Sequence, residues 1–175
     1  MQRISVVGAT GSGKTTVAAA IGERLGLPMV ELDAIHWGPD WTPIDRAVIR
    51  KQIGEVLETD EWVIDGNYRG LVQDLVWAAA DTVVWLDLPF RTNSSQLVSR
   101  TVRRISGRER LWNDNRESWR TAVFSRDSIL WWLIKTHRKV RKRYAHDLVS
   151  GEMEHAGWVR LRSRSEVDGW LSSLD

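Results

Sequence analysis

The stretch Gly8–Thr15 has the sequence GATGSGKT and matches the pattern G-x-x-x-x-G-K-[ST] at every position. It follows the run RISVVG at 3–8, which predicts a strand, and it leads into KTTVAAAIGERLG at 14–26, which predicts a helix. A glycine-rich turn that matches by chance is the alternative, and the flanking strand and helix argue against it. Strand, loop and helix in this order predict a phosphate-binding loop.

The residue types of this loop suit a nucleotide phosphate. Glycines let the backbone turn tightly with its N–H groups pointing inward, and the start of the helix adds its positive dipole end. Lys14 supplies a cation to the β- and γ-phosphates, and the Thr15 hydroxyl can bind Mg²⁺. We therefore expect ATP and Mg²⁺ as cofactors. The expected nucleotide-binding residues in the loop are Gly8, Ala9, Thr10, Gly11, Ser12, Gly13, Lys14, Thr15 and Thr16.

Outside the loop, short β-rich runs alternate with longer helical ones, which implies a parallel sheet covered on both faces. The expected strands are 3–8, 28–32, 62–65, 82–89 and 157–163. The expected helices are 14–26, 45–58, one after residue 65, 91–106, 117–148 and 165–174. We predict an α/β, three-layer P-loop NTPase fold with a five-stranded parallel sheet. The chain is expected to be a single domain, 1–175, with an acceptor-binding insertion at about 33–60 and a small arginine-rich lid at about 105–118.

The composition narrows the class of protein. The chain has 175 residues and no cysteine, which excludes disulfides, thiolate metal sites and cysteine nucleophiles. It contains neither the apolar stretch of a signal peptide nor a run of about 20 apolar residues. We therefore expect a cytoplasmic protein without a membrane partner.

Charge is distributed unevenly along the chain. Residues 1–90 carry 7 Lys and Arg against 13 Asp and Glu, a net charge of −6. Residues 91–144 carry 15 against 4, a net charge of +11, and residues 145–175 carry 3 against 6, a net charge of −3. A basic middle segment in an otherwise acidic chain suggests a polyanionic partner, and nucleotide phosphates or nucleic acid would both qualify.

Two acidic residues end predicted strands. Asp87 follows the apolar run TVVWL, where P-loop proteins hold Mg²⁺, although strand-ending acids are also common turn residues. Asp65 ends the strand WVID and is followed by Gly66, Asn67, Tyr68 and Arg69. If this third strand lies beside the first, Asp65 and Arg69 would face the bound phosphates, because the carboxyl ends of parallel strands share one crevice.

Taken together, these motifs resemble those of adenylate kinase and its nucleoside monophosphate kinase relatives, over most of the chain. The third strand of that family ends in D-G-F-P-R, with a Gln four residues later, and this chain has Asp65-Gly66-Asn67-Tyr68-Arg69 and then Gln73. The resemblance implies that Arg69 binds the acceptor phosphate, that Gln73 recognises an adenine edge and that Asp65 supports the metal. Gly66 would also lie on the acceptor side. Asn-Tyr in place of Phe-Pro is a departure within this loop.

The resemblance extends to the arginines. The family has an R-x-x-x-R pair leading into its lid, matched by Arg100 and Arg104, and an arginine in a VRKR run, matched by Arg141 or Arg143. Arg100 would contact the nucleotide, and Arg104 and Arg143 would stabilise the transferring phosphoryl group. The alternative for 138–143 is a solvated basic helix face.

The acceptor side differs from that of adenylate kinases. Their pattern G-D-x-x-R after the second strand is replaced by Leu32-Asp33-Ala34-Ile35-His36, followed by Trp37. The arginine that would bind the phosphate of AMP is therefore missing. Asp33 also resembles the substrate-binding Asp of shikimate- and gluconate-type kinases, where it meets a hydroxyl. We expect Asp33 to bind the acceptor and to act as hydrogen-bond acceptor or general base, with His36 and Trp37 beside it. A helix or turn cap is the alternative role for Asp33.

The combination ELDAIHW, DGNY and WNDNRESW most resembles a bacterial group related to adenylate kinase and known as DNA topology modulation proteins. We expect an ATP-dependent phosphotransferase that moves the γ-phosphoryl group of MgATP to a small-molecule acceptor, with nucleotides among the candidates. One alternative is a nucleic-acid-associated P-loop ATPase or regulator, and another is a 5′-hydroxyl polynucleotide kinase. Nucleic acid is the less favoured partner, because several of the basic residues match kinase positions.

Overall fold

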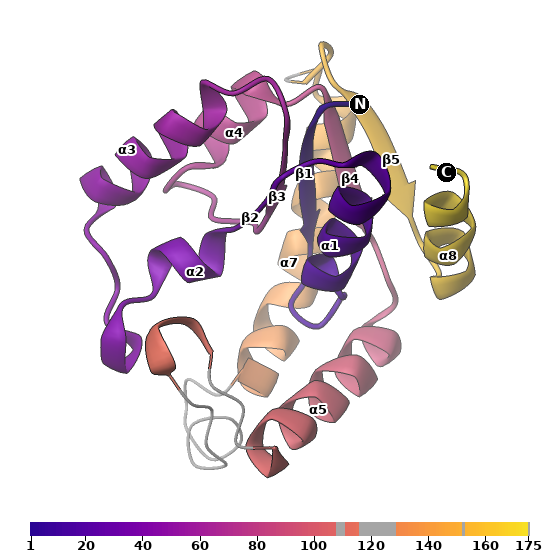
Figure 1. Cartoon of the computed structure of the whole chain (residues 1–175). Helices are drawn as coiled ribbons and strands as arrows, with labels where there is room; N and C mark the ends of the chain where they lie inside the picture. The colour runs from indigo at the N-terminus through magenta and orange to yellow at the C-terminus, as the bar shows by residue number, and fades with distance from the viewer. Residues whose placement is uncertain (108–110, 116–128, 152, 175) are drawn as a thin grey trace.

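The structure is a computed structural model that describes residues 1–107, 111–115, 129–151 and 153–174 (Figure 1). Its five strands form one parallel sheet in the order β2-β3-β1-β4-β5. The strands are β1 (Arg3–Gly8), β2 (Met29–Glu31), β3 (Trp62–Asp65), β4 (Thr82–Leu86) and β5 (Gly157–Leu161). The predicted α/β fold with a five-stranded parallel sheet is confirmed.

Helices follow most of the strands along the chain. They are α1 (Lys14–Leu25), α2 (Leu32–His36), α3 (Arg46–Leu57), α4 (Gln73–Ala79), α5 (Phe90–Ser106), α7 (Ile129–Val149) and α8 (Arg164–Ser172). Two short 3₁₀ helices, η1 (Pro39–Trp41) and η2 (Trp112–Asp114), lie in the connections. None of the described helices is long and apolar enough to span a membrane.

Helices cover both faces of the sheet, as Figure 1 shows for α1 in front of it and α7 behind. Ile4 and Val6 of β1 point to one face, where they pack with residues of α1 and α8, and Val7 points to the other. That second face packs against α3, α4 and α7, with Ile53 and Trp77 among its fully or nearly buried residues. The result is the expected three-layer arrangement.

The strand order gathers the candidate residues at one edge of the sheet. β1 lies between β3 and β4, with Val6 beside Asp65 and Gly8 beside Leu86. Glu31 at the end of β2 lies beside Asp65. The expectation that the third strand neighbours the first is confirmed, so the phosphate-binding loop and the ends of β2 and β3 share this edge.

Some predicted boundaries differ from the structure. The strand predicted at 82–89 ends at Leu86, and α2 and η1 are short helices that the sequence did not predict. Asp33 in the first turn of α2 suits a helix start, because an acid there interacts favourably with the dipole. Of the helix predicted at 117–148, the part from 117 to 128 lies outside the described residues, as do residues 108–110 and 116–118 of the predicted lid.

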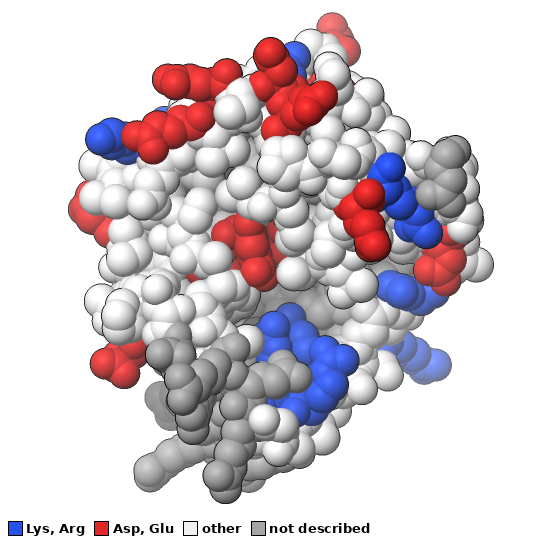
Figure 2. Space-filling view, viewed as in Figure 1, with Lys and Arg blue, Asp and Glu red and all other residues white. Residues whose placement is uncertain are grey.

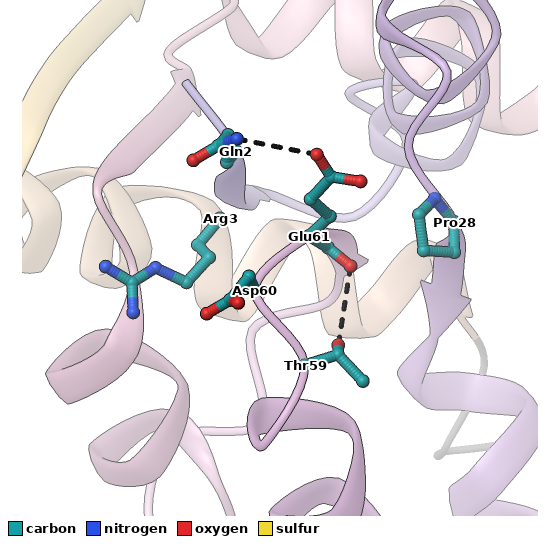
Figure 3. A pocket seen from close by; sticks show the side chains of 6 residues that line it. All are labelled: Gln2, Arg3, Pro28, Thr59, Asp60 and Glu61. Carbon is teal, nitrogen blue, oxygen red and sulfur yellow. Dashed lines mark hydrogen bonds between the residues drawn. The ribbon is translucent and has the colours of Figure 1, made fainter.

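A hollow of about 650 Å³ lies at the opposite end of the sheet (Figure 3). It is lined by Gln2, Arg3, Pro28, Thr59, Asp60 and Glu61. Gln2 Nε2 donates to Glu61 Oε1 at 3.4 Å, and the Thr59 hydroxyl donates to the Glu61 carbonyl at 3.4 Å. These residues precede β2 and β3 or begin β1, so the hollow lies away from the phosphate-binding loop.

Candidate active site

The phosphate-binding loop connects β1 to α1 through a turn that depends on glycine. Gly11 and Gly13 have φ values of 77° and 85°, a region that residues with a Cβ rarely adopt. A Cβ on Gly11 would also collide with the Asn93 carbonyl oxygen and lie 2.9 Å from Leu97 Cβ. The loop therefore packs directly against α5, and its glycines are required by both backbone angle and space.

The start of α1 provides the groups that a phosphate needs. Ser12 is fully buried, and its Oγ has no hydrogen-bond partner among the described residues. Lys14 Nζ turns back over the loop to the Ala9 carbonyl, at 3.4 Å, and Thr16 is exposed on the first turn of α1. An orphaned hydroxyl and a lysine at a helix N-terminus fit nucleotide phosphates.

Thr15 joins the loop to the end of β3. Its hydroxyl donates to Asp65 Oδ2 at 2.6 Å and lies 3.4 Å from Glu31 Oε1. Asp65 is only 4% exposed, and its Oδ1 has no hydrogen-bond partner among the described residues. Mg²⁺ keeps several waters and takes only one or two protein ligands beside the phosphates. The threonine hydroxyl and the free carboxylate oxygen fit such an ion, although no cluster of three ligating side chains is found in the described part of the chain.

The electrostatics of Asp65 reflect its place between charges of both signs. Burial raises its pKa from 3.8 to about 6, and the nearby Asp33 and Glu31 carboxylates add to this effect. The ammonium of Lys14 and the hydrogen bond from Thr15 act in the opposite direction. A buried carboxylate of this kind gains from a cation placed beside it.

Asn67 links the end of β3 to the start of the loop. Its Oδ1 accepts from the Gly8 N–H at 3.1 Å, and its Nδ2 donates to the Gly8 carbonyl at 2.7 Å. The Tyr144 hydroxyl of α7 donates to the same Oδ1 at 3.0 Å. In the sequence, Asn67 is notable only because it departs from the D-G-F-P-R pattern. Neither that pattern nor the spacing of the residues predicts its contact with Gly8.

Asp33 and Tyr68 meet at the side of the site that the sequence predicts to bind the acceptor. The Tyr68 hydroxyl donates to Asp33 Oδ1 at 2.5 Å, and burial of the phenol, helped by the Asp33 charge, raises the pKa of Tyr68. The His36 ring lies 4.8 Å from the Tyr68 ring, and burial lowers the pKa of His36 against the pull of Asp33. Buried His36 Nδ1 has no partner among the described residues. Asp33, Tyr68 and His36 therefore form one polar group, although Tyr68 comes from a different motif than Asp33 and His36.

Next to this polar group, a row of tryptophans runs from the predicted insertion to the described part of the predicted lid. Trp37 contacts His36 at 4.5 Å and Trp41 at 5.8 Å, and Trp41 contacts Trp112 at 6.3 Å, all as ring-centroid distances. Trp112 Nε1 donates to Glu31 Oε2 at 2.8 Å.

Two asparagines hold the segment 111–115 against the insertion. Asn115 Oδ1 accepts from the Trp41 N–H at 2.9 Å, and its Nδ2 donates to the Gly38 carbonyl at 2.9 Å. Asn113 Nδ2 donates to the Trp37 carbonyl at 2.5 Å. This part of the expected lid therefore contacts the segment 37–41 of the predicted insertion.

The charges of Arg69 and Arg143 both affect the pKa of Tyr144. Arg69 Nη1 forms an ion pair at 2.8 Å with Asp147 of α7, whose side chain is 1% exposed. Burial raises the pKa of Tyr144, while the charges of Arg143 and Arg69 lower it and that of Asp147 raises it. The structure thus brings these two predicted arginines together, but it pairs Arg69 with a carboxylate. Its role in binding an acceptor phosphate stays a prediction.

Asp87 is also occupied by arginines. Its Oδ2 accepts from Arg160 Nη2 at 2.6 Å and Nε at 3.0 Å, and Arg141 Nε lies 2.9 Å from its Oδ1. The Arg160 guanidinium also lies 4.4 Å from the centre of a Trp85 ring. Metal binding by Asp87 stays a prediction, whereas the free oxygen of Asp65 favours Asp65 for that role.

The remaining candidates lie on α4 and α5. Arg104 lies over the Trp112 ring at 5.9 Å, and Arg100 lies one turn before it on α5. Gln73 begins α4 and is buried, with its Oε1 lacking a partner among the described residues.

In Figure 2 acidic side chains gather where β2 and β3 end, and basic side chains gather below them across a hollow.

The fold and the loop define the class: this chain has the α/β fold of the P-loop kinases. No protein-family model matches the chain, and no curated protein matches it. Solved structures do. A gluconokinase from Sinorhizobium meliloti 1021 is 21% identical, with a TM-score of 0.55 over 99% of this chain and 93% of that one.

Two shikimate kinases are similar in the same way. The enzyme from Bacteroides thetaiotaomicron is 15% identical, with a TM-score of 0.53 over 99% of this chain and 96% of that one. The enzyme from Acinetobacter baumannii, in complex with shikimate, is 14% identical, with a TM-score of 0.54 over 99% and 90%. At these identities the likeness establishes the fold.

Proposed function

We propose that this chain is an ATP-dependent phosphotransferase that moves the γ-phosphoryl group of MgATP to a hydroxyl group of a small molecule. One observation carries the proposal: at a single edge of the sheet, the phosphate-binding loop, the Thr15–Asp65 contact and the Asp33–Tyr68 pair converge. The similar solved structures include a gluconokinase and shikimate kinases, which favours a small-molecule acceptor with hydroxyl groups.

The roles of the residues follow from this geometry. Backbone N–H groups of the loop and Lys14 would bind the phosphates, and Thr15 with Asp65 would hold Mg²⁺, which supplies positive charge against that of the phosphates. The acceptor oxygen bonds to the γ-phosphorus as the bond to the ADP oxygen breaks, and Asp33 accepts the proton of the hydroxyl. Arg100, Arg104 and Arg143 are the candidates for stabilising the transferring group.

Two side chains bear on the chemical class of the acceptor. His36 stands where adenylate kinases have an arginine, and Arg69 is paired with Asp147. Both observations disfavour a phosphate on the acceptor near these side chains, so we rank hydroxylated small molecules above nucleoside monophosphates.

An acceptor screen tests the proposal. ADP release from MgATP is measured with nucleoside monophosphates, nucleosides, sugars, sugar acids and 5′-hydroxyl oligonucleotides. We expect at least one acceptor to stimulate ADP release, and Lys14→Ala to abolish it. Lys51→Ala, which removes an exposed lysine of α3, is the matched control and should keep full activity. Full activity in Lys14→Ala would refute the proposal.

The segment 91–144 carries a net charge of +11, which is also compatible with the alternative of a nucleic-acid partner. Within the described residues, Arg104 lies over Trp112 and Arg141 pairs with Asp87, which supports roles inside the protein for these two. A salt titration with duplex and single-stranded DNA separates the alternatives, because tight binding that falls steeply with salt would favour a nucleic-acid partner.

A further inference from the structure

The side-chain amide of Asn67 forms two hydrogen bonds with the backbone of Gly8. It accepts from the N–H at 3.1 Å and donates to the carbonyl at 2.7 Å, so it pairs with Gly8 as a neighbouring strand would. Gly8 is the last residue of β1 and the first of the phosphate-binding loop. Its φ is 157°, and a Cβ at this position would lie 2.8 Å from Ser12 Oγ and 2.9 Å from the Leu86 carbonyl oxygen, so there is no room for a side chain. The amide therefore acts where the chain leaves the sheet and turns around the phosphates.

Tyr144 orients this amide. Its hydroxyl donates to Asn67 Oδ1, so that oxygen accepts two hydrogen bonds while Nδ2 donates one. Burial raises the pKa of Tyr144, which keeps the phenol protonated and able to donate. A flipped amide would set its Nδ2 against the Gly8 N–H and its Oδ1 against the Gly8 carbonyl, so the Gly8 backbone selects the orientation. The hydrogen bond from Tyr144 to Oδ1 holds the amide in that orientation.

We propose that Asn67 is a positioning residue that sets the start of the phosphate-binding loop, with Tyr144 holding its amide in the correct orientation. Loop N–H groups bind phosphate strongly only if they already point inward before the nucleotide arrives. Asn67 follows Asp65 and Gly66 and precedes Tyr68, which contacts Asp33. The same short segment therefore holds the nucleotide side and the acceptor side in a fixed relation.

The proposal rests on the proposed function in that it takes the loop to bind MgATP. Three variants test it: Asn67→Ala, Asn67→Asp and Tyr144→Phe, with the exposed Gln52→Ala of α3 as a matched control for loss of an amide. Affinity for MgATP is measured by isothermal titration calorimetry. In the nucleotide-free protein, amide hydrogen exchange is measured in the peptide that contains residues 8–15.

The order of the effects is the informative result. Asn67→Ala should weaken MgATP binding about tenfold, because it removes both hydrogen bonds to Gly8 as well as the one from Tyr144. Tyr144→Phe removes only the last of these and should weaken binding about threefold. Asn67→Asp should weaken it on the order of a hundredfold, since a carboxylate oxygen would face the Gly8 carbonyl and add negative charge beside the phosphates. A residue that only fills space would give the opposite order, because Asp has nearly the shape of Asn and Ala leaves a cavity.

Hydrogen exchange keeps the two proposals separable. Each variant should speed exchange in the 8–15 peptide while Gln52→Ala does not, whether or not the wild type binds MgATP. If the wild type binds no MgATP, the proposed function falls, and the exchange data still decide the role of Asn67. Unchanged exchange in Asn67→Asp, or affinity within twofold of wild type, would overturn the positioning role. Should Asn67→Ala fail to fold, Tyr144→Phe supplies the same comparison with its packing retained.

Discussion

The buried carboxyl group of Asp65 should make the nucleotide-free protein less stable as the pH rises. Burial raises its pKa from 3.8 to about 6 in the folded protein. Below pH 3.8 the group is protonated in both states, and above that value the unfolded chain ionises first. Stability is therefore lost as the pH rises from about 4 through about 6, by about 3 kcal/mol in total, of which about 1 kcal/mol falls between pH 5 and pH 7.5.

Urea unfolding of the wild type and Asp65→Asn at pH 5 and pH 7.5, without nucleotide or divalent cations, measures this loss. An asparagine cannot ionise, so the free energy of unfolding of the variant minus that of the wild type should increase by about 1 kcal/mol across the interval. Asp60→Asn, at the opposite end of the sheet, is the control and should follow the wild type. A difference between Asp65→Asn and wild type that stays constant with pH would refute the reasoning.

Three further variants test other contacts. Arg160→Ala leaves buried Asp87 with Arg141 alone and should lower the free energy of unfolding by about 2 kcal/mol, while the exposed Arg162→Ala changes it little; equal effects would count against the ion pair. Tyr68→Phe removes the hydrogen bond to Asp33 and should raise the KM for the acceptor about threefold without changing MgATP affinity, whereas a change in MgATP affinity alone would contradict its place on the acceptor side. Asn115→Ala loses two hydrogen bonds to the insertion and should speed amide exchange at residues 38–41, and unaltered exchange there would argue against this contact.

The phosphate-binding loop and the sheet were predictable because their signals are local. Eight consecutive residues carry the loop, and apolar runs of four to six residues carry the strands, so both can be recognised without knowledge of the fold. The position of Asp65 beside the loop also followed, since parallel strands end at one edge. The sequence left the partners of the side chains open.

Those partners depend on packing between distant segments. Asn67 and Gly8 are 59 positions apart, Arg69 and Asp147 are 78 apart, and Trp112 and Glu31 are 81 apart. No periodicity or spacing encodes such pairs. Asp87 illustrates the consequence, because the strand pattern predicts a metal ligand at this position and nothing in the sequence indicates that Arg160 of β5 lies beside it.

The most direct test of the central claim follows the γ-phosphoryl group itself. The protein is incubated with Mg²⁺ and ATP labelled in the γ-phosphate, together with an acceptor identified by ADP release, and the products are separated by mass spectrometry. We predict that the label appears on a hydroxyl of the acceptor in equal amount to the ADP formed, and that Lys14→Ala transfers none. Label recovered only as inorganic phosphate, with every acceptor tried, would contradict the account.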